Sequence, residues 1–165
     1  MSMEARYVDE TVVRMAELMT PALENFSGHV HGGAILALLD RAAYVCSCKF
    51  AGCYCVTVAV DWVEFRAPVR VGELLILTSR VVHVGTSSMT VEIEVESQDI
   101  PTGECRRTNI CTFTMVAVRD GVKVSVPRLL SRTPEDDARL RSAGLHRAVR
   151  EEYRRRHEQI PDPPA

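Results

Sequence analysis

The stretch NFSGHVHGGAILALLD, residues 25–40, decides the fold, because it joins a loop rich in Gly and His to an apolar run that ends in an acid. From Ala34 to Cys48 the side chains are nearly all Ala, Leu, Ile, Val or Cys, which predicts a helix wrapped by the rest of the protein. An unpaired buried carboxylate is costly or changes its pKa. We therefore expect Asp40 to have a function.

The composition limits the class of protein. A chain of 165 residues, 46% of them hydrophobic, suits one domain with its own core. The formal net charge of -2 argues against a nucleic-acid partner, since such proteins usually carry a basic excess. The sequence contains no run of about 18 apolar residues, so it does not predict a membrane-spanning helix. The N-terminus lacks the layout of a signal peptide. We expect a cytoplasmic protein.

Six cysteines raise the question of a metal site or disulfides. They occur as C-x-C pairs and single residues, which is not the spacing of structural zinc, and no His-x3-His partner exists. In a reducing cytosol Cys behaves as a small buried hydrophobe. We predict packing roles and no metal for these residues: Cys46, Cys48, Cys53, Cys55, Cys105 and Cys111.

The segments that follow the helix predict an antiparallel sheet. Apolar and polar residues alternate from Met89 to Glu96 with the two-residue period of a strand whose second face is wet. Residues 5–19 fit either a strand or a helix. Further strands are predicted at 55–65, 73–84 and 106–118, with turns at Gly85-Thr86, Pro101-Thr102-Gly103 and Asp120-Gly121.

A second helix is predicted from Pro134 to about His157. Thr133 supplies an N-cap, Pro134 suits the first helical position, and Glu135 and Asp136 place acids in the first turn. Prolines 161, 163 and 164 predict a frayed tail. We divide the chain into residues 1–130, the main domain, and 131–165, the C-terminal helix and tail.

The loop and helix carry a family resemblance. The pattern Asn25-x-x-Gly28-x-Val30-His31-Gly32-Gly33 with Asp40 seven residues later resembles the signature of hotdog-fold acyl-CoA thioesterases. The resemblance covers about residues 12–145 and implies an α+β hotdog fold, a long antiparallel β-sheet wrapped around a central α-helix, with a C-terminal helix. Segments typical of the acyl-CoA hydrolase branch are VTVAVD (56–61), FRAPVRVGE (65–73), VGTSS (84–88), VPRL (126–129) and TPE (133–135).

This resemblance implies three catalytic positions. Asp40 would act as a general base toward water or as a nucleophile that forms an anhydride, and the sequence does not separate these routes. Backbone N–H groups at the helix start, near Gly32 and Gly33, would face the developing oxyanion. Asn25 matches the second catalytic position, where an amide orients water or the thioester oxygen. A competing role for Asp40 is a carboxylate at a subunit interface, paired with Arg41 or another basic residue.

Other residues are candidates for substrate contacts. His31 is expected to fix the loop by hydrogen bonding rather than to shuttle protons. Gly85, Ser87 and Ser88 occupy a turn whose donors could meet the pantetheine arm or the nucleotide. Guanidinium groups match phosphate oxygens, and the candidates are Arg66, Arg70, Arg106, Arg107 and Arg128.

The function implied is hydrolysis of acyl-CoA to a free fatty acid and coenzyme A, with no cofactor or metal. One subunit of this fold leaves a sheet edge and a helix flank open, so we expect a homodimer. The resemblance implies that dimers assemble further into a trimer of dimers. Two alternatives stay open. One is an acyl-thioester hydratase or dehydratase, which would need a His partner for the acid. The other is a non-catalytic acyl-CoA-binding module.

Overall fold

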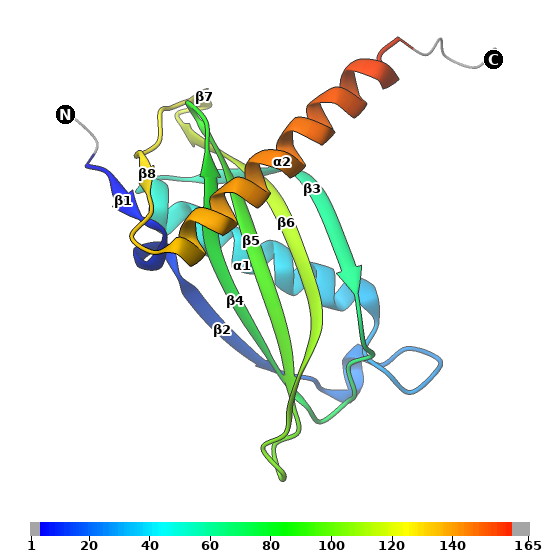
Figure 1. Cartoon of the computed structure of the whole chain (residues 1–165). Coiled ribbons are helices and arrows are strands. Elements are labelled where there is room, and N and C mark those ends of the chain that lie inside the picture. The colour runs from blue at the N-terminus through cyan, green and yellow to red at the C-terminus, as the bar shows by residue number, and fades with distance from the viewer. Residues whose placement is uncertain (1–3, 160–165) are drawn as a thin grey trace.

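The computed structural model describes residues 4–159, which form a curled sheet, two α-helices and short accessory elements (Figure 1). The tail predicted around Pro161 lies outside the described residues. In chain order the elements are β1 (Arg6–Tyr7), the 3-10 helix η1 (Val8–Thr11), β2 (Val13–Leu18), the 3-10 helix η2 (Pro21–Leu23), α1 (Gly32–Ala51), β3 (Cys55–Phe65), β4 (Leu74–Val84), β5 (Ser88–Gln98), β6 (Cys105–Arg119), β7 (Val122–Lys123), β8 (Leu129–Leu130) and α2 (Pro134–His157).

The main sheet has the strand order β2-β4-β5-β6-β3, with β7 paired to β6. All three predicted turns are confirmed, since they join β4 to β5, β5 to β6 and β6 to β7 in antiparallel pairs. β3 does not pair with β4, which follows it in the chain, but with β6. Residues 66–73 connect β3 to the start of β4. In this strand order β2 and β3 are the two edges of the sheet. The open choice at residues 5–19 resolves as β1, η1 and β2.

Helix α1 lies on the concave side of the sheet, which curls around it (Figure 1). His31 caps its N-terminus, because Nδ1 accepts a hydrogen bond from the Gly33 N–H at 3.0 Å. Gly52 ends it in the left-handed conformation with φ 68°, which favours glycine. Side chains such as Leu39 and Phe50 are fully buried against the strands, and each contributes about 2 kcal/mol by leaving water.

The sheet wraps α1 as predicted, but in the single chain it does not cover the whole circumference of the helix. One stripe of the helix stays exposed, and Asp40 lies on it together with Leu36, Ala37, Tyr44 and Val45. The stripe faces away from the sheet, and an apolar sequence pattern cannot tell burial by the same chain from burial by another. No helix within residues 4–159 combines the length and apolar character that a membrane crossing requires.

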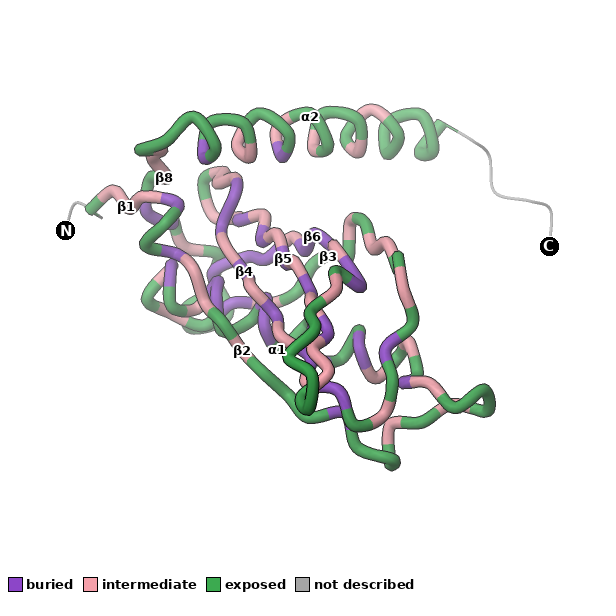
Figure 2. The backbone as a smooth tube through the Cα atoms, turned by 60° about the horizontal axis from the view of Figure 1, so that its bottom comes forward, coloured by how far each residue is buried: buried purple, intermediate pink, exposed green. Residues whose placement is uncertain are grey.

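Helix α2 covers the outer face of the sheet (Figure 2). Its predicted start is confirmed, because the Thr133 side chain accepts from the Asp136 N–H and Asp136 accepts in return. The prediction that the polar face of β5 is wet is wrong. Arg139 of α2 bonds to Glu92 at 2.5 Å and to Glu94 at 3.3 Å, so these acids anchor the helix.

Candidate active site

Asp40 projects from the exposed stripe of α1 beside the edge strand β3. Its Oδ1 accepts a hydrogen bond from Thr57 Oγ1 at 2.6 Å, so a strand residue fixes the orientation of the helix carboxylate. Over residues 4–159, no Arg, Lys or His forms an ion pair with it. Arg41, the competing partner, donates instead to the Ala37 carbonyl at 3.3 Å. The second oxygen of Asp40 is thus available to a water molecule or a substrate.

Asn25 lies in a loop that projects from the body of the protein before α1 (Figure 1). Its Oδ1 accepts from the Ser27 N–H at 2.8 Å, from Ser27 Oγ at 2.8 Å and from the His29 N–H at 3.2 Å. The side chain therefore organises the loop through its oxygen. Its Nδ2 donates to no described residue, so a hydrogen-bond donor stays free in a fixed direction. Phe26 beside it is fully exposed.

The start of α1 offers one free amide. The Gly33 N–H is already bonded to His31 Nδ1, which is the loop-fixing geometry expected for His31. The Ala34 and Ile35 N–H groups both donate to the His31 carbonyl, at 2.9 and 3.2 Å. Among the described residues none accepts from the Gly32 N–H. Of the two amides that the resemblance implies for an oxyanion site, the Gly33 N–H is thus engaged within the loop, and the Gly32 N–H has no acceptor among residues 4–159.

Two groups of predicted residues are separated along α1. Asn25 and Gly32 line one pocket of about 320 Å³, together with Ile35, Phe65 and Val69. Asp40 lies eight residues beyond Gly32, which is about 12 Å along a helix axis. The single chain therefore does not bring Asn25 and Asp40 to one point.

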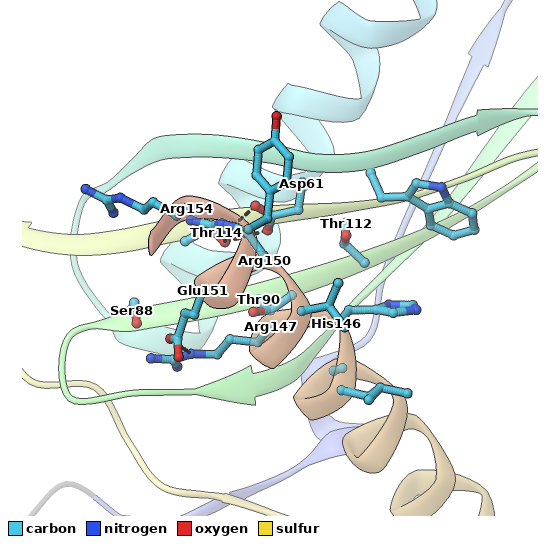
Figure 3. A pocket seen from close by; sticks show the side chains of 15 residues that line it. Asp61, Ser88, Thr90, Thr112, Thr114, His146, Arg147, Arg150, Glu151 and Arg154 are labelled. Atoms are coloured by element: carbon cyan, nitrogen blue, oxygen red, sulfur yellow. Dashed lines mark hydrogen bonds and ion pairs between the residues drawn. The ribbon is translucent and has the colours of Figure 1, made fainter. Parts of the chain in front are cut away.

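The turn at Gly85 borders a larger groove of about 840 Å³ between α2 and strands β3, β5 and β6 (Figure 3). Ser88 lines it. A methyl group at Gly85 would lie 2.8 Å from Ser88 Oγ and 3.4 Å from Arg147 Nη1, so the turn and α2 are in close contact. Ser87 is held by its backbone, whose carbonyl accepts from the Ala117 N–H at 2.9 Å. Sequence reasoning missed Arg147, because it is one of many arginines in the C-terminal helix. Nothing in the sequence indicates that this one contacts the Gly85 turn.

The candidate arginines divide into engaged and exposed groups. Arg106 is bonded to the buried Glu73 at 2.7 Å, so it is not free to bind a phosphate. Arg66 pairs with Glu64 at 2.8 Å. Arg107 and Arg128 are exposed. Arg128 keeps its place through its carbonyl, which accepts from the Arg6 N–H at 2.9 Å.

The cysteines are free thiols in the described chain, and three of them, Cys46, Cys55 and Cys111, are buried. Burial raises the pKa of the Cys46 thiol to about 11 and of the Cys55 and Cys111 thiols to about 12. Such thiols stay protonated at neutral pH and are poor nucleophiles. In the part of the chain that the structure describes, no three His, Cys, Asp or Glu side chains come together as a metal site.

Sequence comparison supports the family resemblance. Residues 27–104 match the family model described as the thioesterase superfamily. The chain is 39% identical over 142 residues to protein VdlD of Helicobacter pylori, with 86% of this chain and 82% of the relative covered. It is 30% identical over 157 residues to the uncharacterized acyl-CoA thioester hydrolase YkhA of Bacillus subtilis, with 94% and 91% covered.

Solved structures agree with the sequence matches. An apo-hexameric acyl-CoA thioesterase is 30% identical with a TM-score of 0.87, and the match covers 91% of this chain and 97% of that one. An acyl-CoA hydrolase from Bacillus cereus is 29% identical with a TM-score of 0.87, covering 94% and 95%. These matches confirm the predicted hotdog fold. The chain belongs to the thioesterase superfamily, in its branch of acyl-CoA thioester hydrolases.

Proposed function

We propose that the protein hydrolyses acyl-CoA to a carboxylic acid and coenzyme A at a site shared by two copies of the chain. The observation that carries this proposal is the placement of Asp40. Asp40 lies on the exposed apolar stripe of α1, and Thr57 of β3 orients its carboxylate. The Asn25 loop and the free Gly32 amide lie about half the length of α1 away. A second copy that packs on the stripe could supply the missing half of each site.

The surface around Asp40 suits such a partner. β3 is an edge strand, paired on one side with β6, and it exposes apolar side chains such as Val58 and Val60. Long apolar edges pair with other strands unless they are covered. Leu36, Tyr44 and Val45 extend the same kind of surface over α1. A twofold dimer through β3 and α1 would cover both.

Higher assembly is part of the same proposal. The second half of α2 exposes Leu145, Val149 and Tyr153, which repeat every four residues and so share one helix face. We propose that dimers associate into a trimer of dimers, and a structurally similar acyl-CoA thioesterase is hexameric. Free thiols fit a reducing compartment such as the cytoplasm.

The chemistry follows from the groups at the site. The Gly32 amide and the positive end of the α1 dipole would stabilise the thioester oxygen as it gains charge. Asp40 would take a proton from water as the water oxygen bonds to the carbonyl carbon. Collapse of the intermediate breaks the C–S bond, and the departing thiolate takes the proton back. In the other route an Asp40 oxygen displaces the thiolate and water then hydrolyses the anhydride.

Asn25 would contribute its free Nδ2 donor to the thioester oxygen or to the attacking water. The groove at Ser88 and Arg147 would receive the phosphorylated end of coenzyme A, since hydroxyl and guanidinium donors suit phosphate oxygens. Arg128 is a further candidate for this end.

A hydratase or dehydratase is less well supported. That chemistry needs a histidine beside the acid. His31 instead caps the start of α1, and no described histidine bonds to Asp40.

A binding module without turnover would have the same geometry, so only an activity assay can distinguish it from an enzyme. We expect steady release of free thiol from acyl-CoA substrates between acetyl-CoA and palmitoyl-CoA. Binding without any release would refute the proposed activity.

Val60→Asp is expected to dissociate the dimer and to remove nearly all turnover, because a charge on the covered edge would be buried without a partner. Light scattering gives the mass and a thiol-release assay gives the rate. Val122→Asp is the control, since Val122 is also exposed but lies on β7, away from β3 and α1. A Val60→Asp protein that keeps its mass and activity would exclude this interface.

Cys46→Ala is expected to change stability more than rate. The side chain is fully buried in the core, so its loss should cost about 1 kcal/mol of unfolding free energy and leave kcat within about twofold.

EDTA is expected to leave hydrolysis unchanged, because no cluster of metal-binding side chains exists in residues 4–159. Urea unfolding and the thiol-release assay test both expectations. Zinc that copurifies in stoichiometric amount and is lost together with activity would contradict them.

A further inference from the structure

Glu73 is a buried carboxylate that the proposed chemistry does not use. Only 4% of its surface is exposed, at the start of β4. Its Oε1 accepts from Arg106 Nη1 at 2.7 Å, and its Oε2 accepts from Arg106 Nη2 at 2.8 Å. Ser97 Oγ and the Arg70 N–H, at 2.9 Å, also donate to Oε2. Both oxygens are therefore fully engaged, by groups on three other parts of the chain.

The environment of Glu73 favours its charged form. Burial opposes the charge, but the hydrogen bonds from Arg106, Ser97 and the Arg70 amide outweigh burial, so the pKa of Glu73 lies below its usual value. The forked geometry of Arg106 gives direction as well as strength to this pair. Two apolar side chains could fill the same space without loss of stability. The presence of the Glu73–Arg106 ion pair is therefore better explained by the backbone geometry that it imposes.

That geometry reaches the segment between β3 and β4. Arg106 Nη2 also donates to the Pro68 carbonyl at 2.9 Å, while Glu73 holds the Arg70 amide. The pair thus fixes the backbone on both sides of Val69. Gly72 completes the bend with φ 90°, and its N–H donates to the Met19 carbonyl at 2.7 Å.

The same segment carries the Asn25 loop. The Val30 N–H donates to the Val69 carbonyl at 2.9 Å, and His29 and Arg70 form an antiparallel bridge. His29 in turn donates its N–H to Asn25 Oδ1 at 3.2 Å. Hydrogen bonds joined by the short backbone segments 69–70 and 29–30 therefore link the carboxylate of Glu73 to the side chain of Asn25. Pro68 and Val69 also line the pocket that Asn25 lines.

We propose that Glu73 and Arg106 are positioning residues that set the direction of the Asn25 side chain through residues 68–70. The inference rests on the proposed function, in which Asn25 acts on the thioester. Neither Glu73 nor Arg106 would touch the substrate. Their loss would displace Asn25 from the reacting carbonyl, and displacements of this kind lower turnover even when substrate still binds.

The experiment is a double-mutant cycle between Glu73→Gln and Asn25→Ala, read by kcat and KM. Glu73→Gln keeps the size of the side chain and removes its charge. In the parent we expect it to lower kcat by about tenfold or more with KM within about twofold. In the Asn25→Ala protein we expect it to change kcat by less than about twofold, because the group that it positions is gone. Arg106→Lys should follow the same pattern, since lysine keeps the charge but loses the fork.

Glu92→Gln is the matched control. Like Glu73, Glu92 is an acid that pairs with arginine, in its case Arg80 and Arg139, but it is half-buried and anchors α2 on the opposite face of the sheet. It should lower Tm as Glu73→Gln does and leave kcat unchanged.

The outcomes separate the two proposals. If Glu73→Gln lowers kcat by the same factor with and without Asn25, or if Glu92→Gln lowers kcat equally, the pair acts only on stability and the inference fails. If Asn25→Ala alone leaves kcat at the parental value, the proposed role of Asn25 fails instead. Should Glu73→Gln not fold, Arg106→Lys in both backgrounds decides in its place.

Discussion

Asp40→Asn is expected to lower kcat by at least about 10²-fold while the protein folds, assembles and binds substrate as before. Asparagine has the same shape and can still accept the Thr57 hydrogen bond, but it cannot take a proton from water or form an anhydride. The exposed position of Asp40 means that the change should cost little stability. The measurement is single-turnover and steady-state thiol release, with substrate binding followed by calorimetry.

Asp137→Asn is a suitable control for this result. Asp137 is also an exposed acid on a helix, and it accepts a hydroxyl hydrogen bond, from Ser131 Oγ at 2.5 Å, on α2. Turnover should stay at the parental level in this variant. If Asp40→Asn retained activity within a few-fold of the parent, Asp40 would be neither base nor nucleophile.

Asn25→Ala and Asp40→Ala homodimers are each expected to be nearly inactive, yet mixing the two chains should restore activity. If Asn25 of one copy faces Asp40 of the other, every site in either homodimer lacks one group. In a mixed dimer one site receives both lesions and the other receives neither. A random mixture contains about half mixed dimers with one intact site each, which gives roughly a quarter of parental turnover when the sites act independently.

Two affinity tags, one on each chain, allow the mixed dimer to be purified and assayed. Its turnover should approach half of the parental value per dimer, because one of its two sites is intact. Mixing Asp40→Ala with Asp40→Asn chains is the control and should rescue nothing. A purified mixed dimer as inactive as the single variants would place Asn25 and Asp40 in one subunit and refute the shared site.

Local patterns in the sequence predicted most of the secondary structure. The alternation from Met89 to Glu96 predicted β5, and the Thr133 cap predicted the start of α2, because both signals depend on neighbouring residues alone. The position of β3 at the sheet edge was not predictable in this way. Its partner, β6, begins 40 residues after β3 ends, and only long-range packing selects it.

For the candidate site, the sequence could name residues but could not show how they are arranged. The resemblance named Asp40 and Asn25, and whether they act together is still a prediction, since the single chain separates them. Arg106 was proposed for phosphate because the sequence gives no sign of its partner, Glu73, which lies 33 residues earlier. That the Gly33 N–H is engaged depends on where one imidazole nitrogen of His31 points, which is a property of the folded loop.

The hydrogen bond from Thr57 to Asp40 links two tasks to one strand. β3 carries the hydroxyl that orients the carboxylate, and it is also the edge on which we propose that the second copy docks. On this proposal a newly made chain holds a correctly aimed Asp40 before it meets a partner, but no thioester can be hydrolysed there. Turnover per chain would then fall on dilution below the dissociation constant of the dimer, so the amount of protein in the cell would itself set how much of it is active.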